Sequence, residues 1–249
     1  ALEIVQADVL ARVWRAAGDE VFFNTGTDEH GQKILEAAQR AEQEPQAYVD
    51  RYAVEFQKLK QALNLGNDAF IRTSSPAHIS AAQEMWHRCE KKGDIYKKTY
   101  AGLYCVGCES FKTDKEIVDG HCVIHTNLKL EEITEENYFF KFKNYEKQLL
   151  EYLSKGNVIV PEWRRQEAIA FVKGGLEDFS ISREKKRLSW GIPVPGDDSQ
   201  VMYVWFDALV NYVSALGWPA SVKAPAGEAS QEGEFEKWWP GIQIAGKDN

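Results

Sequence analysis

The sequence predicts an α/β fold in which an α+β module interrupts an alternating series of strands and helices. Strand-turn-helix patterns run through residues 20–93, and a strand running into a helix follows at residues 200–219. Between them, short β-like runs surround closely spaced cysteines. Alternating strands and helices are typical of a sheet covered by helices, because each helix buries its apolar face on the sheet. We therefore divide the chain into residues 1–93, an inserted module at 94–183, and a return to the first fold at 184–249.

The first part begins with an amphipathic helix. Residues 1–15 place four apolar side chains on one helical stripe, namely Leu2, Val5, Val9 and Val13. Strands are predicted at residues 20–26 and within residues 67–76. Helical periodicity predicts three further helices, at residues 32–43, 45–64 and 78–93. Pro45 suits the start of a helix and Gly93 suits the end of one.

The inserted module mixes short strands with helices. Its β-like runs lie at residues 95–105 and 137–142, and its helical patterns at residues 145–156 and 161–175. A segment punctuated by Pro and Gly at residues 187–197 then leads into the strand and helix of residues 200–219. The last stretch, residues 241–249, is typical of a short buried strand followed by a turn.

Composition and charge narrow the class of protein. With 44% hydrophobic and 27% charged residues, the 249-residue chain is typical of a globular domain. No apolar run approaches the roughly 18 residues of a membrane span, so we expect no membrane association. The net charge of −8 argues against a protein that mainly grips nucleic acid, because phosphate binding needs concentrated Lys and Arg. Four cysteines without a disulfide-like framework favour a reducing compartment, and we expect a cytoplasmic protein, although an organellar form stays open.

A metal site is predicted in the inserted module. Two ligand pairs, each with two intervening residues, are formed by Cys105 with Cys108 and by Cys122 with His125. This spacing forms knuckle turns that direct both side chains of a pair at one zinc ion. Four protein ligands leave no open position, which indicates a structural ion and not a catalytic one. The alternative is a chance pair of cysteines beside a solvent-facing histidine.

A candidate substrate residue lies in the turn after the first predicted strand. The stretch "TGTDEHG" joins that strand to a helix, and ligands bind at this end of strands in open α/β sheets. The carboxylate of Asp28 can hold a substrate ammonium group by a charge-assisted hydrogen bond. The alternative is that Thr27, Asp28 and Glu29 cap the following helix and complement its dipole.

Two further stretches contain candidate binding residues. Trp205, Leu209 and Tyr212 share one face of the last predicted helix and suit a pocket for an apolar, polarisable side chain. Such a stripe is also typical of a buried core. Asp248 follows the last predicted strand, where its carboxylate can accept from ribose hydroxyls or an ammonium group, or can serve as an ordinary turn residue.

In this order, these stretches resemble the methionyl-tRNA synthetases, a family of class I aminoacyl-tRNA synthetases. The resemblance covers essentially the whole chain, and the combination of "GTDEHG" with "YVWFDA" is its most specific part. The stretches that carry it are "ADVLAR", "GTDEHGQKI", "YCVGC" with "CVIH", "NYFFKF", "ISR" with "WGIPVPGD", "YVWFDALVNY" and "IAGKD".

The resemblance implies a Rossmann-like catalytic domain interrupted by a connective-peptide insertion with one zinc knuckle. It implies that Asp28 engages the amino group of methionine and that Trp205 and Tyr212 line the pocket for its side chain. Leu209 stands where many family members have Pro, so that wall is expected to differ in shape. Asp248 is implied near the ribose and the amino acid.

The implied reaction joins methionine and ATP, with magnesium, into methionyl-adenylate and pyrophosphate, and then transfers methionine to tRNA(Met). The family's HxGH element is expected before Ala1, and its KMSKS loop and anticodon-binding domain after Asn249. We therefore expect a part of a longer enzyme that does not activate methionine by itself, because each lost set of phosphate donors costs about two to three orders of magnitude in rate.

Two alternatives differ in function. The first is a related synthetase for leucine, isoleucine, valine or cysteine. The insertion at residues 94–183 is too short for the large editing domain of the first three, and a cysteine enzyme places its zinc in the amino-acid pocket. The second is a non-catalytic, synthetase-derived module that binds RNA or serves as a scaffold.

Overall fold

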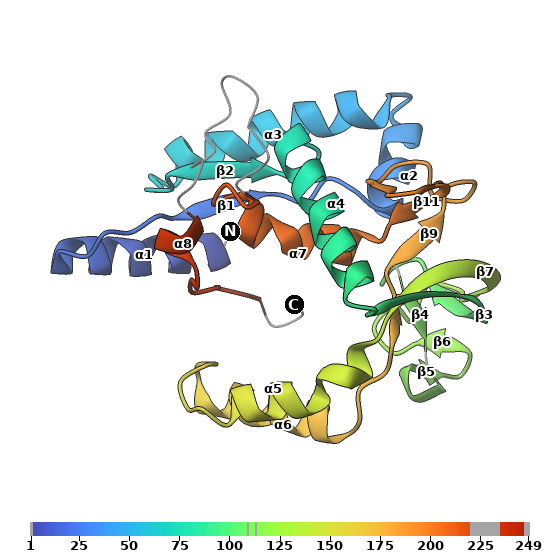
Figure 1. Ribbon diagram of the computed structural model, residues 1–249. Coiled ribbons are helices and arrows are strands. Elements are labelled where there is room, and N and C mark those ends of the chain that lie inside the picture. Colours follow the sequence, from blue (N-terminus) through green and yellow to red (C-terminus); the bar gives the residue numbers. More distant parts are fainter. Residues whose placement is uncertain (1, 109, 113, 220–234, 247–249) are drawn as a thin grey trace.

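The computed structural model describes residues 2–108, 110–112, 114–219 and 235–246 (Figure 1). The N-terminal helices and strands form the upper part of the molecule in this view. A long antiparallel strand pair lies on one side, and a helical hairpin extends beneath it. None of the described helices combines the length and apolar character needed to span a bilayer.

The N-terminal part alternates between helices and strands as predicted. Its elements are α1 (Leu2–Ala17), β1 (Asn24–Thr27), α2 (Gln32–Arg40), α3 (Pro45–Ala62), β2 (Ala69–Arg72) and α4 (Pro76–Lys91). β1 and β2 pair in parallel, in a register that begins at Asn24↔Ala69 and ends at Thr27↔Arg72. The prediction of a strand from residue 20 was wrong at its start, because the ladder with β2 begins only at Asn24.

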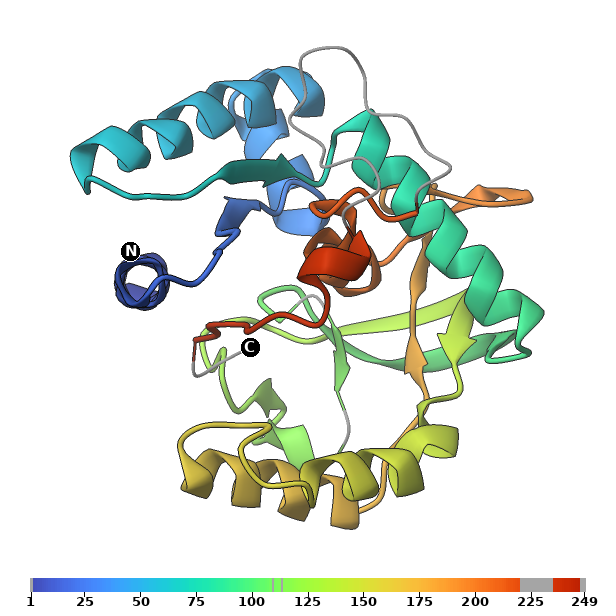
Figure 2. The same ribbon diagram turned by 60° about the vertical axis from the view of Figure 1, so that its left-hand side comes forward.

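Helix α1 forms where the sequence predicts it, but its apolar stripe faces outward. Leu2, Val9 and Val13 are each more than half exposed, whereas Asp8 and Ala11 are buried. The helix is held by polar contacts: Asp8 Oδ1 accepts from the backbone N–H of Gly66 at 2.6 Å. Figure 2 shows α1 end-on at the edge of the molecule. Arg12 and Arg15 donate to the backbone carbonyls of Asn64 and Gly66. In the described part of the chain, such polar contacts, and not the exposed apolar stripe, attach α1 to the segment before β2.

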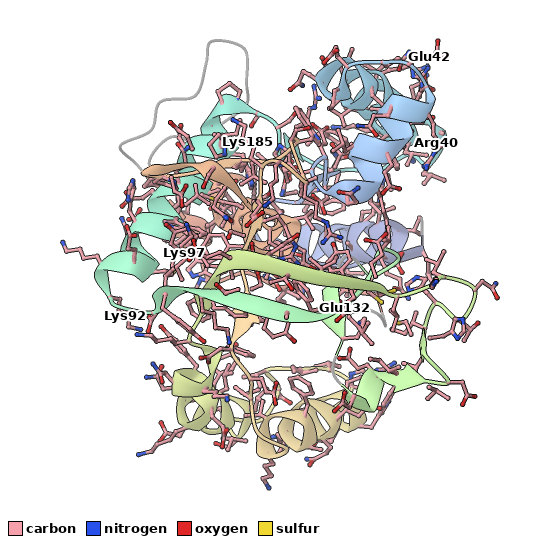
Figure 3. The ribbon with its side chains drawn as sticks, turned by 90° about the vertical axis from the view of Figure 1, so that its right-hand side faces the viewer. Arg40, Glu42, Lys92, Lys97, Glu132 and Lys185 are labelled. Carbon is pink, nitrogen blue, oxygen red and sulfur yellow. The ribbon has the colours of Figure 1, made fainter. Side chains whose placement is uncertain are left out.

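The inserted module is built on a four-stranded antiparallel sheet in the order β4-β3-β7-β8. Its strands are β3 (Ile95–Cys105), β4 (Ser110–Lys112), β7 (Glu131–Phe140) and β8 (Phe179–Ser180), and a small second sheet pairs β5 (Ile117–Val118) with β6 (His121–Cys122). Lys97 and Glu132 mark opposite ends of the β3–β7 pair (Figure 3). Two short 3-10 helices, η1 (Asp114–Glu116) and η2 (Phe142–Tyr145), complete these connections.

The helical hairpin of the module consists of α5 (Glu146–Leu153) and α6 (Glu162–Lys173). It has a small apolar core of its own, centred on Leu153, Val172 and Leu176. Both helices were predicted from their periodicity. The hairpin extends away from the other elements in both ribbon views (Figures 1 and 2).

The last part of the chain returns to the N-terminal part. It contains the antiparallel sheet β10-β11-β9 followed by helices, with β9 (Ser182–Glu184), β10 (Pro193–Val194), β11 (Asp197–Met202), α7 (Val204–Ser214) and α8 (Phe235–Trp238). The main core joins α4 to α7: Ala82 and Trp86 pack with Val210 and Val213, and Ile181 and Met202 complete this cluster. Helix α7 is thereby fixed against the first part of the chain.

The predicted strand at residues 241–249 is wrong for the residues that are described. Residues 241–246 form no strand, and Ile242 is 66% exposed, so the segment is not buried. The physical reason is that this segment pairs with neither β1 nor β2, which form a sheet of two strands. Asp248 lies outside the described residues.

Candidate functional site

The loop after β1, residues 28–31, is anchored through the buried side chain of Glu29. The Glu29 carboxylate is 2% exposed and accepts from Arg72 through two nitrogens, Nε at 2.8 Å and Nη2 at 3.0 Å. The Thr27 hydroxyl donates to Glu29 at 2.6 Å, and the Ser74 hydroxyl donates as well. The hydrogen bonds that Arg72 donates to Glu29 raise the pKa of Arg72 against the opposing effect of burial, and a further hydrogen bond to Asp50 acts in the same direction. Glu29 therefore ties the loop to β2.

The backbone of Glu29 is also held on both sides. Its N–H donates to the Thr73 hydroxyl at 2.9 Å, and its carbonyl accepts from Trp190 Nε1 at 2.7 Å. The neighbouring Asp28 is exposed. The loop thus presents the predicted substrate carboxylate at the surface from a backbone that is fixed at the next residue.

The alternative interpretation of this loop, as a helix cap, is wrong. Helix α2 begins at Gln32, and its N-cap residue is Gly31, with no side-chain cap hydrogen bond. The Thr27 hydroxyl is bonded to Glu29 instead. Gly31 has a φ of 102° and a ψ of 170°, a region that is essentially restricted to glycine. The side chains of this loop therefore bond within the loop and to β2 instead of capping α2.

Two buried histidines face one buried carboxylate between this loop and the last helices. His30 Nδ1 lies 3.1 Å from Asp207 Oδ2, and His78 Nε2 lies 3.6 Å from Asp207 Oδ1. On its other side, His78 Nδ1 lies 2.9 Å from the Ser214 hydroxyl. Asp207 and His78 are fully buried. The loop, α4 and α7 therefore meet at Asp207.

The predicted binding face of α7 is exposed, so the alternative of a buried core stripe is wrong. Trp205, Leu209 and Tyr212 are 42%, 60% and 37% exposed. The opposite face of the helix, with Asp207, Val210 and Val213, supplies the buried side chains. Helix α7 therefore has one buried face and one exposed face, and Trp205 and Tyr212 lie on the exposed face.

Tyr212 also lines a cavity of about 330 Å³. The residues around it come from α1, the β1 region, the end of α8 and the segment after it, and include Ile4, Phe22, Thr25, Trp238 and Ile242. The volume is in the range of small-molecule sites. Asp28, Trp205 and Leu209 do not line this cavity, and the roles of all five predicted binding residues stay predictions.

Sequence reasoning missed His30, His78 and Asp207 as members of this site. One signal was present: Asp207 interrupts an otherwise apolar helical stretch, "VWFDALV", on the side away from the aromatic residues. A charged residue at a core position needs a partner, which points to a buried contact. The sequence does not reveal which residues are the partners.

The four predicted metal ligands come together. Their ligand atoms, one from each of Cys105, Cys108, Cys122 and His125, all lie within 4.8 Å of one another. Cys108 Sγ lies 3.2 Å from His125 Nδ1 and 3.6 Å from Cys122 Sγ, and all four cysteines of the chain are free thiols. The alternative of a histidine facing away from the cysteines is wrong.

The surroundings of the cluster fit a metal ion. A Cβ atom on Gly107 would lie 2.5 Å from the His125 ring, so the first knuckle turn leaves no room for a side chain. Burial raises the pKa of Cys108 to about 11. Burial would also raise the pKa of Cys122, but backbone N–H groups of Ile124 and His125, together with hydrogen bonds to Cys108 and His125, lower it to about 6, so in the metal-free cluster the thiolate is favoured at Cys122. Three sulfurs and one imidazole are the donors that zinc prefers, and they leave no open position.

Comparison with known proteins identifies the family. The protein-family model described as "tRNA synthetases class I (M)" matches residues 1–129 and 115–249, which together span the chain. The chain belongs to this family. The class I (M) synthetase assignment disfavours the leucine, isoleucine, valine and cysteine alternatives.

Curated relatives of this class I (M) chain are named methionine–tRNA ligase. The one from Thermosynechococcus vestitus is 45% identical over 247 residues, which cover 98% of this chain and 45% of the relative. The one from Thermotoga maritima is 39% identical over 249 residues, covering 98% of this chain and 38% of the relative. The chain thus spans less than half the length of these relatives.

Solved class I (M) structures resemble the fold. The Mycobacterium tuberculosis methionyl-tRNA synthetase in complex with methionyl-adenylate matches with a TM-score of 0.85 and 39% identity, over 96% of this chain and 45% of that one. The apo form of the same enzyme matches with a TM-score of 0.74 and 36% identity, over 96% and 44%. The predicted fold class, a class I synthetase α/β fold with a cysteine and histidine cluster, is confirmed.

Proposed function

We propose that the protein containing this sequence is a methionine–tRNA ligase. It would join methionine and ATP into methionyl-adenylate and then transfer methionine to tRNA(Met). Membership of the class I (M) synthetases, along the whole chain, is the observation that carries this proposal. The likeness to the methionyl-adenylate complex of the Mycobacterium tuberculosis methionyl-tRNA synthetase, at a TM-score of 0.85, supports it.

In this proposal, Asp28 holds the ammonium group of methionine. Its exposed carboxylate next to the anchored Glu29 supports the role, because a fixed backbone lowers the entropy lost on binding. Trp205, Leu209 and Tyr212 contact the methionine side chain, and their exposure on α7 leaves them accessible to it. Asp248 accepts from the ribose or the amino acid, a role that rests on sequence resemblance.

We also propose that the cluster of Cys105, Cys108, Cys122 and His125 holds one structural zinc ion and that magnesium accompanies ATP. The donor set supports zinc. The ion, when bound, would hold the β3–β4 turn and β6 together, and no step of the reaction would pass through it. The division at residues 94–183 and a cytoplasmic location remain part of the proposal, the latter because free thiols suit a reducing compartment.

Methionine-dependent exchange of pyrophosphate into ATP tests the activity in the full-length protein. We expect exchange with methionine and far slower exchange with leucine or cysteine. Asp28→Asn should raise the KM for methionine by about tenfold to a hundredfold, because it removes a charge-assisted hydrogen bond of about 1.5–3 kcal/mol. Asp198→Asn, at an exposed carboxylate in β11, is the matched control and should change little.

A scaffold would behave differently. A protein that neither exchanges pyrophosphate nor gains thermal stability from saturating methionine would favour the non-catalytic module, because a ligand that binds the folded state must stabilise it. Charging of tRNA(Met) transcripts then tests the second half of the reaction.

A further inference from the structure

We propose that Asp207 is a positioning residue for the amino-acid pocket. It would hold the aromatic face of α7 at a set distance from Asp28 through a hydrogen bond with His30 and a close contact with His78. The proposal rests on the proposed function, since the pocket that it positions is the methionine site. It assigns a role to three buried residues that do not themselves need to touch the substrate.

The position of Asp207 on α7 supports this role. Asp207 lies on the buried face of the helix, whereas Trp205, Leu209 and Tyr212 lie on the exposed face. His30 is likewise buried, two residues after the exposed Asp28 in a loop whose backbone is held at Glu29. A single contact, His30 Nδ1 to Asp207 Oδ2 at 3.1 Å, thus joins the backs of the two elements that present the predicted binding groups.

The third residue, His78, ties the same point to α4. Its ring lies between Asp207 Oδ1, at 3.6 Å, and the Ser214 hydroxyl, at 2.9 Å. The two oxygens of the Asp207 carboxylate therefore face different histidines: Oδ2 faces His30 and Oδ1 faces His78. Ser214 is on α7, about two helical turns beyond Asp207, so His78 contacts α7 at two levels. A helix held at two levels resists rotation about its axis, and such a rotation would turn the aromatic face.

The hydrogen-bonding chemistry is consistent with a carboxylate at this position. A carboxylate only accepts, so His30 donates through Nδ1–H and His78 faces it with Nε2–H. The Nδ1 atom of His78 then accepts from the Ser214 hydroxyl. The 3.6 Å separation leaves Asp207 Oδ1 and His78 Nε2 without a normal hydrogen bond, although both are fully buried.

Stability alone does not explain this arrangement. Replacing buried charged or polar groups by well-packed apolar side chains is often neutral or stabilising, so a core that only needed stability would not require a carboxylate here. Directional bonds instead specify one orientation among several packings. The geometry between the loop and α7 is what such bonds would fix.

The test compares Asp207→Ala with Asp207→Asn in the full-length protein. The alanine variant loses both acceptors and should raise the KM for methionine by about tenfold to a hundredfold, since small misplacements of binding groups cost about this much. The KM for ATP should change less than twofold. The asparagine variant should recover most of the loss, because its carbonyl still accepts from His30. Its NH₂ can donate to Nε2 of the other tautomer of His78, in which Nδ1–H donates to the Ser214 hydroxyl.

Asn137→Ala is the matched control for loss of a buried polar group. Asn137 is fully buried in the sheet of the inserted module, bonded to Glu135 and with one unpartnered oxygen, like Asp207. It should lower thermal stability without separating the two KM values. A double-mutant cycle with His30→Ala and Asp207→Ala should show coupling in the KM for methionine.

The outcomes separate the two proposals. A wild-type protein without methionine-dependent exchange would overturn the proposed function. An active wild type in which Asp207→Ala lowers stability but leaves the KM for methionine unchanged would overturn the positioning role alone. If Asp207→Ala does not fold, the His30→Ala variant decides: an unchanged KM for methionine in that variant would equally reject the proposal.

Discussion

The indole Nε1 of Trp190 donates to the backbone carbonyl of Glu29 at 2.7 Å, across 161 positions of the chain. The Trp190 ring also contacts the ring of His30, with 5.2 Å between the centroids. The segment between β9 and β10 therefore supports the loop that presents Asp28. The second half of the sequence thus holds the candidate substrate residue of the first half.

Trp190→Phe should weaken binding of methionine more than it weakens the fold. The phenyl ring keeps part of the contact with His30 but leaves the Glu29 carbonyl without its donor, which costs about 1–3 kcal/mol when the carbonyl is buried. Urea unfolding measures this loss, and pyrophosphate exchange measures the KM for methionine. Trp163→Phe, at an indole that is 55% exposed on α6, serves as the control. Equal effects of the two substitutions would contradict the supporting role of Trp190.

Arg72→Ala should destabilise the protein by about 3 kcal/mol, because it leaves the buried carboxylate of Glu29 without its charged partner. Arg72→Lys should recover only part of this, since a lysine cannot donate in the paired geometry of a guanidinium. The free energy of unfolding from denaturant titration checks both. Arg164→Ala, at an exposed pair with Glu167, should cost less than about 1 kcal/mol. A similar loss in all three variants would show that the Glu29–Arg72 pair is not special.

Gly107→Ala should lower the zinc content, because its Cβ would lie 2.5 Å from the His125 ring and displace a ligand. Gly156→Ala is the matched control: nothing lies within 4 Å of a Cβ there. Metal analysis of the purified proteins, with a chelator competition, reports occupancy and affinity. Full zinc content in Gly107→Ala would mean that the knuckle turn tolerates a side chain and that the fit argument is wrong.

Lowering the pH should remove the contribution of Asp197 to the free energy of unfolding. A hydrogen bond from Lys97, with others from Ser199 and Tyr138, lowers the pKa of Asp197 to about 2, below its ordinary value of 3.8. Because this pKa is lowered in the folded state, the ionised Asp197 stabilises the fold above about pH 4. This contribution is lost as the pH falls from about 4 to about 2 and the carboxylate becomes protonated. Asp197→Asn should flatten this part of the curve of unfolding free energy against pH. An unchanged slope would show that the Lys97–Asp197 contact between the insertion and β11 does not form in solution.

Local patterns in the sequence predicted what depends on short-range geometry. Helical periodicity located α1 to α7, with small differences at their ends, and β1 and β2 lie within the two N-terminal stretches predicted as strands. The ligand pairs around Cys105 and Cys122 are set by turns of a few residues, so their spacing alone predicted a cluster that the structure assembles.

The amino-acid sequence by itself determined the elements, the metal-ligand cluster and the family. Only the tertiary structure decided which side of each element is covered. It left the stripe of α1 and the aromatic face of α7 exposed, left residues 241–246 outside any sheet, and brought His30 and His78 to Asp207 from far away in the chain. The physical reason is that burial and pairing depend on which surfaces meet after folding. The periodicity of one segment does not reveal which other segment will cover it or pair with it.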